Sequence, residues 1–142
     1  MSSENVKAAS KMWDGFNTRD FDLSVESFAP DYRFRDHATG QTIEGAEQFR
    51  EHMQLWTGGF SDGKLNDTQL HDAGGTVIGQ TVFVGTNDGP FGPMLPTGKP
   101  ASIPICLVWR FNDLSQIVEQ EAYYDQLGLM VQLGHAEPPP AE

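Results

Sequence analysis

The stretch TVIGQTVFVGT, residues 76–86, decides the fold, because it belongs to a series of long β-like runs that fill the second half of the chain. Ala73-Gly74-Gly75 precedes it and is a signal for a tight hairpin. Asn112-Asp113 turns the chain into the last run. The strands predicted in this half are residues 64–72, 76–86, 101–112 and 116–124. We therefore expect a meander of long antiparallel strands.

The first half of the chain has the spacing of helices. Apolar residues recur every three or four positions from Val6 to Phe16, which predicts a helix over residues 5–17. The elements predicted after it are a helix at 23–28 capped by Asp22, a strand at 32–36, a return strand at 41–43 and a helix at 46–56. Helices first and long strands afterwards is an α+β order. A curved antiparallel sheet wrapped around the N-terminal helices would bury the helix faces and one sheet face.

Length and charge restrict the possible partners. The chain has 142 residues, with nine Lys and Arg against twenty Asp and Glu, which gives a net charge of −11. This length fits one domain, residues 1–134, followed by a Pro-rich tail, residues 135–142, that we expect to be disordered. The negative charge argues against nucleic acid and anionic membranes as partners. The sequence has no long apolar stretch and no signal-peptide pattern, so we expect a cytoplasmic protein.

The segment NDGPFGPMLPTG, residues 87–98, interrupts the meander. It is too rich in Gly and Pro for regular structure. A loop of this length is uncommon in a compact domain unless it covers a site or is disordered. The sequence leaves both interpretations open.

Metal and cofactor chemistry has little support in the sequence. The four histidines are scattered, and no pair of His or Cys has the spacing of a metal site. Phosphate-loop, dinucleotide-binding and Gly-x-Ser-x-Gly patterns are missing. Cys106 lies in the apolar run Ile105–Trp109, where a buried hydrophobic role is expected. We expect no metal and no cofactor, which leaves acid–base chemistry by carboxylates.

Asp36 is the first candidate for that chemistry. It ends a predicted strand, follows the aromatic residues Tyr32 and Phe34, and precedes His37. A carboxylate that faces an apolar pocket can act as a general base. The alternative is that Asp36 caps the turn at Gly40. His37 either orients a substrate oxygen or pairs with a carboxylate at the surface.

The last predicted strand alternates between two polar faces. Strand geometry puts one set of residues on one face, Val118, Gln120, Ala122 and Tyr124, and another set on the other, Glu119, Glu121, Tyr123 and Asp125. A face that lines a cavity would supply hydrogen-bonding groups among apolar walls. The alternative is a solvated edge above packed tyrosines. Asp125 is better explained as the N-cap of a closing helix, residues 126–133.

Several segments resemble one known family. The stretch EAYYDQLGLMVQLG, residues 121–134, resembles the C-terminal signature of SnoaL-like proteins, the polyketide-cyclase branch of the nuclear-transport-factor-2-like (ketosteroid-isomerase-like) superfamily. Residues 84–86, 89–91 and 96–99 look like the central strand and loop of that family, and residues 27–36 resemble the start of its first strand. The resemblance extends from about Val6 to Gly134.

The resemblance implies a cone: a bent antiparallel sheet around helices, of the cystatin-like type, with an apolar cavity at its wide end. It also implies a homodimer formed through the outer sheet face. In the ketosteroid isomerases an aspartate at the end of the first strand moves a proton alpha to a carbonyl, and this role falls on Asp36. The cyclases use an aspartate on the last strand, preceded two residues earlier by a histidine. Those positions are Ala122 and Gln120 here, so the cyclase mechanism does not transfer unchanged.

From these observations we expect an enzyme that binds a small apolar carbonyl compound in the cone and uses no cofactor. The expected catalytic residues are Asp36, Gln120 and Glu121; Glu121 would require a one-residue change of register that also turns its side chain to the other face. The expected substrate-binding residues are Trp13, Phe16, Phe34, His37, Trp56 and Tyr124. One alternative is a non-catalytic ligand-binding or dimerisation module of the same fold. Another is hydrolysis or dehydration by a carboxylate-activated water, with a second carboxylate from Glu119, Glu121 or Asp125.

Overall fold

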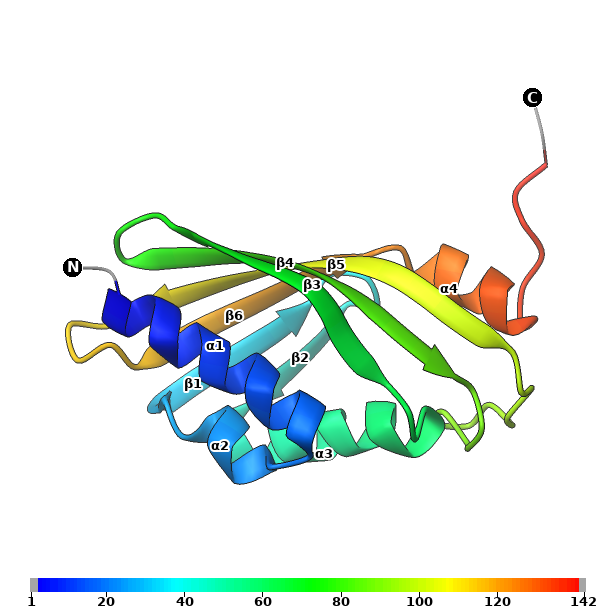
Figure 1. Cartoon of the computed structure of the whole chain (residues 1–142), viewed down its shortest axis with the longest axis horizontal. Coiled ribbons are helices and arrows are strands. Elements are labelled where there is room, and N and C mark those ends of the chain that lie inside the picture. Colours follow the sequence, from blue (N-terminus) through cyan, green and yellow to red (C-terminus); the bar gives the residue numbers. More distant parts are fainter. Residues whose placement is uncertain (1–2, 141–142) are drawn as a thin grey trace.

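The computed structural model describes residues 3–140 and has the predicted α+β architecture (Figure 1). Its helices are α1 (Ser3–Thr18), α2 (Phe21–Val25), α3 (Gly45–Gly59) and α4 (Gln126–Leu133). Its strands are β1 (Phe28–Asp36), β2 (Gln41–Glu44), β3 (Lys64–Asp72), β4 (Thr76–Thr86), β5 (Pro100–Phe111) and β6 (Ile117–Tyr124). The helix and strand order matches the one expected from the sequence.

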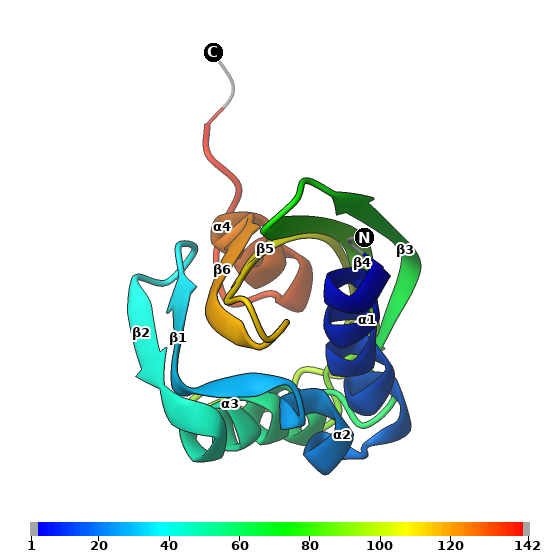
Figure 2. The ribbon, with the colours of Figure 1, turned by 90° about the vertical axis from the view of Figure 1, so that its left-hand side faces the viewer.

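The six strands form one strongly bent sheet in the order β2-β1-β6-β5-β4-β3. Neighbouring strands are antiparallel except for β1 and β6, which run parallel. Viewed along the molecule, the sheet curves from β2 round to β3, and α1 and α3 close its open side (Figure 2). The inner face of the sheet and the apolar faces of the helices thus enclose the core.

Helix α1 buries the apolar stripe that its sequence spacing predicts. Met12, Trp13 and Phe16 are all buried, and α1 lies against β3 and β4. The Trp13 ring meets Trp109 of β5 edge to face, with 5.2 Å between ring centroids. A Cβ atom at Gly79 of β4 would lie 2.6 Å from both indole rings. Glycine at this position therefore lets the two tryptophans pack against the sheet.

The structure corrects two predicted boundaries. The second helix starts at Phe21 and not at Leu23, because Asp20, and not Asp22, caps it by accepting a hydrogen bond from the Leu23 amide (3.2 Å). Strand β1 starts at Phe28 and not at Tyr32. Its first part pairs with Ile117 of β6, with a bulge between Phe28 and Arg33. Local alternation cannot reveal pairing with a strand so distant in sequence.

The loop over residues 87–98 is folded against the end of α3. Asn87 is fully buried, and its side-chain amide donates to the carbonyl oxygens of Gly59 (3.1 Å) and Gly89 (3.0 Å). Its Oδ1 accepts a hydrogen bond from the Thr97 amide (3.0 Å). Phe91 packs its ring against Trp56 of α3, with 5.0 Å between centroids. The alternative of a disordered loop is therefore not supported, and the loop lies beside the core.

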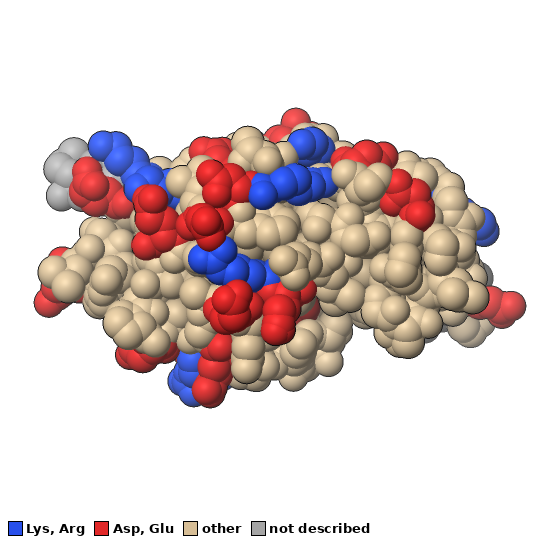
Figure 3. All heavy atoms as spheres, turned by 90° about the horizontal axis from the view of Figure 1, so that it is seen from below, with Lys and Arg blue, Asp and Glu red and all other residues tan. Residues whose placement is uncertain are grey.

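The C-terminal end follows the predicted capping pattern. Asp125 accepts a hydrogen bond from the Gly128 amide (2.8 Å), and Gly134 ends α4 in the left-handed conformation. Residues 135–140 form no helix or strand, and residues 141–142 of the predicted tail lie outside the described range. No helix within residues 3–140 is long and apolar enough to cross a membrane. On the face shown in Figure 3, side chains of both charges are interspersed.

Candidate functional site

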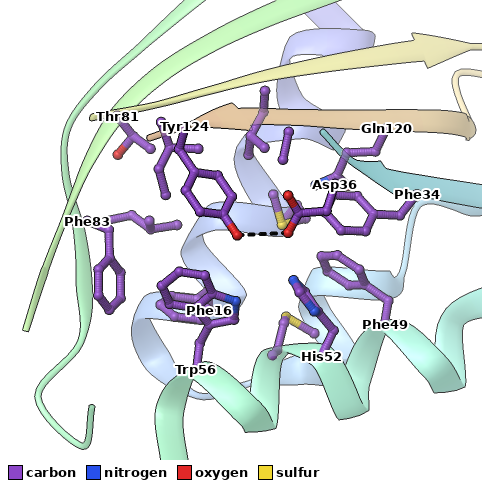
Figure 4. Close-up of a pocket in the computed structure, with 16 residues that line it drawn as sticks. Phe16, Phe34, Asp36, Phe49, His52, Trp56, Thr81, Phe83, Gln120 and Tyr124 are labelled. Carbon is purple, nitrogen blue, oxygen red and sulfur yellow. Dashed lines mark hydrogen bonds between the residues drawn. The ribbon is translucent and has the colours of Figure 1, made fainter. Parts of the chain in front are cut away.

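A cavity of about 80 Å³ lies between the inner face of the sheet and helices α1 and α3 (Figure 4). Most of the side chains that line it are aromatic or aliphatic, and the polar ones come mainly from β1, β6 and α3. The lining residues that bear on function are Phe16, Phe34, Asp36, Phe49, His52, Trp56, Thr81, Phe83, Gln120, Ala122 and Tyr124. The sequence prediction of an apolar hollow inside the bent sheet is thus confirmed.

Asp36 lies at the end of β1 and points into this cavity (Figure 4). The residue is only 2% exposed. Its Oδ1 accepts hydrogen bonds from the amides of Ala38 (2.9 Å) and Thr39 (3.3 Å), and its Oδ2 accepts one from the Tyr124 hydroxyl (2.8 Å). Both interpretations from the sequence therefore hold together. One oxygen caps the turn after β1, and the other faces the cavity.

Two polar residues of β6 share the cavity with Asp36. The Tyr124 hydroxyl donates a hydrogen bond to Asp36. Burial, together with the nearby carboxylate, raises the pKa of Tyr124 well above its ordinary value. Gln120 is fully buried, and its Oε1 accepts a hydrogen bond from the Tyr32 hydroxyl (3.0 Å). The Gln120 amide nitrogen has no partner within residues 3–140, so this donor is free to meet a ligand.

His52 was not predicted as a site residue, yet it lies in the cavity wall beside Asp36 (Figure 4). Its ring packs near Phe34, at 5.2 Å between centroids. Burial lowers the pKa of His52 to about 4, against a smaller opposing effect of the Asp36 charge. Its Nδ1 is buried without a hydrogen-bond partner among the described residues. The signal was its helical spacing of three after Phe49 and four before Trp56, which puts all three on one face.

Three predicted site residues do not face the cavity. Trp13 packs against Trp109 in the core. His37 and Glu121 lie on the outer face of the sheet, where the His37 Nε2 and a Glu121 oxygen are 2.7 Å apart. This placement follows from strand alternation, because each residue is one position from a residue that points inward. The expected cavity positions of Trp13, His37 and Glu121 are therefore wrong.

The outer-face group is an ion-pair network centred on Glu121. Arg110 bonds to Glu121 and, at 3.0 Å, to Glu119, and the Tyr123 hydroxyl donates to Glu121 (3.2 Å). Hydrogen bonds from Arg110, and then from His37, lower the pKa of Glu121 to about 2. Glu119 and Glu121 are thus held outside the cavity, and Asp125 caps α4. None of the three proposed partners of Asp36 reaches it, so the reading that needs a second carboxylate loses its support.

The groups that contact the Asp36 carboxylate are neutral hydrogen-bond donors. Among residues 3–140, no Lys or Arg lines the cavity, and Asp36 is the only carboxylate that does so. Within residues 3–140 no three His, Cys, Asp or Glu side chains gather as a metal site would require. The available functional groups are therefore one buried carboxylate, one phenol, one amide and one neutral imidazole. That set can move a proton and donate hydrogen bonds to a developing oxyanion.

Comparison with known proteins agrees with this geometry. The family model described as SnoaL-like polyketide cyclase matches residues 6–133. The chain belongs to the SnoaL-like polyketide cyclase family. Comparison with curated proteins gives no significant match.

Solved structures of similar shape show the same fold. A candidate SnoaL-like polyketide cyclase from Jannaschia sp. CCS1 is 25% identical, with a TM-score of 0.85 and coverage of 96% of this chain and 95% of that one. A candidate polyketide cyclase from Xanthomonas campestris pv. campestris is 19% identical, with a TM-score of 0.82 and coverage of 93% and 98%. A Catenulispora acidiphila protein with the ketosteroid-isomerase-like fold is 20% identical, with a TM-score of 0.77 and coverage of 94% and 97%.

Proposed function

We propose that this SnoaL-like protein catalyses proton transfer alpha to the carbonyl of a small apolar compound, with Asp36 as the general base. The observation that carries this proposal is the burial of Asp36 in an aromatic cavity to which the described part of the chain contributes no Lys or Arg. A carboxylate in such surroundings is poorly hydrated, and only neutral donors share its charge. Held beside a bound carbonyl compound and away from bulk water, it can act as a general base.

The proposed step is balanced within the site. Asp36 Oδ2 takes the alpha proton, the C–H electron pair forms the enolate double bond, and the carbonyl oxygen becomes the anion. Gln120 has a free amide donor, and the imidazole of His52 is neutral at neutral pH because its pKa is about 4. These two groups would donate hydrogen bonds to the enolate oxygen without adding a positive charge. Asp36 then gives this proton back to one of two atoms. It goes either to the enolate carbon itself or, after that carbon has bonded to a second carbonyl, to the alkoxide oxygen that this bond creates.

The pairing of β1 with β6 supports the assignment of the base to Asp36. In the register of these parallel strands Asp36 lies directly beside Ala122, the position at which the resemblance places the acid–base aspartate of the cyclases. Neighbouring residues in register point to the same side of a sheet, and both line the cavity. A carboxyl group on the adjacent strand would therefore serve the same part of the cavity.

Hydrogen–deuterium exchange tests this proposal without knowledge of the natural substrate. Acetophenone is incubated in D₂O with the protein, and loss of its methyl proton signal is followed by NMR. We expect Asp36→Asn to slow the exchange about 100-fold or more, which is typical of the loss of a general base. The matched control is Asp113→Asn, because Asp113 is exposed in the turn before β6. Equal exchange by the wild type and Asp36→Asn would overturn the proposal.

A non-catalytic ligand-binding module is the second candidate, favoured by alanine at position 122. This reading predicts that acetophenone binds, as measured by calorimetry, while exchange stays at the rate of free ketone in buffer. The pair of measurements therefore separates the two functions.

We also propose that two copies of the chain associate through the outer sheet face. Half-buried apolar side chains lie there on β4 and β5, among them Ile78, Val82 and Val108, with the exposed Tyr123 beside them on β6. Light scattering should give twice the 15.7 kDa mass for the wild type and a single mass for Val108→Glu. A wild-type monomer at micromolar concentration would overturn the dimer.

A further inference from the structure

A second pocket of about 160 Å³ lies next to the inner cavity, on the side of the 87–98 loop. Four side chains line both spaces: Asp36, His52, Trp56 and Tyr124. The proposed base, Asp36, and the proposed donor His52 thus lie at the boundary between an inner and an outer space. A ligand that occupies both spaces would place its middle portion at Asp36.

The two spaces differ in polarity. Apart from the boundary residues, the inner cavity offers only Thr81 and Gln120 among its aromatic and aliphatic walls. The outer pocket has Gln41 at the start of β2 and Gln126 at the start of α4, together with the loop residues Phe91 and Met94. Neither glutamine side chain has a hydrogen-bond partner within the described chain, so both amides are available to a ligand. These two residues have no role in the proton transfer proposed above.

The outer pocket also has no countercharge for an anion. No Lys or Arg of the described residues lines it, and the carboxylate of Asp36 borders it. A carboxylate or phosphate on a ligand would therefore lose hydration and be repelled by Asp36. Hydroxyl and carbonyl groups can instead use the donors and acceptors of the two amides.

We propose that Gln41 and Gln126 form a specificity subsite for the uncharged, hydroxyl- or carbonyl-bearing end of an elongated ketone whose apolar end fills the inner cavity. This inference rests on the proposed function, because it places the reacting carbonyl at Asp36. It names the substrate class as neutral, elongated and polar at one end only. Phe91 and Met94 of the 87–98 loop supply apolar side chains to the outer pocket, so this loop would contact the same end of the ligand.

A matched pair of ketones tests the subsite by binding alone. 5-Hydroxy-1-phenylpentan-1-one and 1-phenylhexan-1-one differ only by a hydroxyl in place of a terminal methyl group. The measured quantity is the ratio of their dissociation constants, from calorimetry. We expect the Gln41→Leu/Gln126→Leu variant to shift this ratio against the hydroxyketone about 3- to 10-fold, the usual effect of a neutral hydrogen bond. Gln69→Leu, an exposed glutamine of β3 outside both spaces, should leave the ratio unchanged.

Two further measurements make the result decisive. The anionic analogue 5-oxo-5-phenylpentanoate should bind the wild type more weakly than either neutral ketone. The same ratio is measured in Asp36→Asn, which keeps the subsite but lacks the base, so a failure of catalysis and a failure of the subsite give different results. A ratio that is equal in the wild type and the Gln41→Leu/Gln126→Leu variant, or tight binding of the anion, would overturn the inference.

Discussion

The two faces of β6 carry similar side chains in opposite electrostatic surroundings. Its inner face presents Gln120, Ala122 and Tyr124 to Asp36, and its outer face presents Glu119, Glu121 and Tyr123 to Arg110 and His37. With residues from neighbouring elements, each side thus combines a carboxylate, a tyrosine and a histidine: Asp36, Tyr124 and His52 inside, and Glu121, Tyr123 and His37 outside. The outer carboxylate has a cationic partner, whereas the inner one has only neutral donors. A carboxylate paired with Arg is a poor base, so the difference between the faces indicates where the chemistry lies.

Moving the carboxyl group within the inner face gives the largest expected effect. Asp36→Ala should reduce the ketone exchange rate about 100-fold, because the general base is lost. Adding Ala122→Asp should restore about tenfold of this loss, because residue 122 lies beside residue 36 in the β1–β6 register. The rates are measured by NMR in D₂O, as for the single variants.

The control for this pair adds a carboxyl group to the other face. Asp36→Ala/Tyr123→Asp places it one residue along β6, where the side chain points away from the cavity. It should recover nothing. Equal recovery in both double variants would mean that added charge, and not its position, restores the rate.

Strand alternation predicted the division between the two faces correctly. The period of two in β6 placed Gln120, Ala122 and Tyr124 together, and the position of Asp36 at a strand end indicated a cavity-facing carboxylate. The same rule also implies that His37 and Glu121 point outward. Their inclusion as site residues came from chemical type and from a possible change of register, and the register did not change.

Helix periodicity was less informative about the site. It identifies the buried face of α1 but not which part of that face meets the sheet and which part meets a cavity. Trp13 meets Trp109, whereas Phe16, one turn later, lines the cavity. His52 was missed because its helical spacing places it on one face with Phe49 and Trp56 but does not show which residues of the sheet that face meets. Its proximity to Asp36 depends on how α3 packs against β1, which only tertiary structure defines.

The second prediction concerns His52 and the pH dependence of folding. Burial lowers its pKa from 6.5 to about 4, so the folded protein binds this proton less readily than the unfolded chain. The contribution of neutral His52 to the free energy of unfolding is therefore complete above pH 6.5 and is lost as the pH falls towards 4. One pKa unit corresponds to about 1.4 kcal/mol, so this residue should account for about 2–3 kcal/mol of lost unfolding free energy.

Urea denaturation at pH 7 and pH 4.5 measures this effect. The loss of stability between the two pH values should be smaller in His52→Gln than in the wild type. His71→Gln is the control, because His71 is an exposed residue of β3 and its replacement should leave the pH dependence unchanged.

In the exchange assay at pH 7, His52→Gln should retain a hydrogen-bond donor and lose less than tenfold in rate, whereas His52→Phe should lose more. Identical rates for the two variants would remove His52 from the proposed oxyanion contacts.

The smallest effect is expected on the outer face. Glu121→Gln removes the centre of the ion-pair network but no group that faces the cavity. Because the Glu121 side chain points away from the cavity, the exchange rate should change less than about threefold. Unfolding free energy at pH 7 should fall by about 1 kcal/mol, as is usual for ion pairs near the surface. The pKa of Glu121 is lowered from 4.5 to about 2, so its contribution is present above pH 4.5 and is lost as the pH falls towards 2. This range overlaps that of His52 only between about pH 4.5 and 4. The loss between pH 7 and 4.5 is therefore compared in His52→Gln, and the loss between pH 4.5 and 3 in Glu121→Gln. A tenfold fall in exchange caused by Glu121→Gln would mean that the network acts through the sheet on Asp36, and the two faces would then form one functional unit.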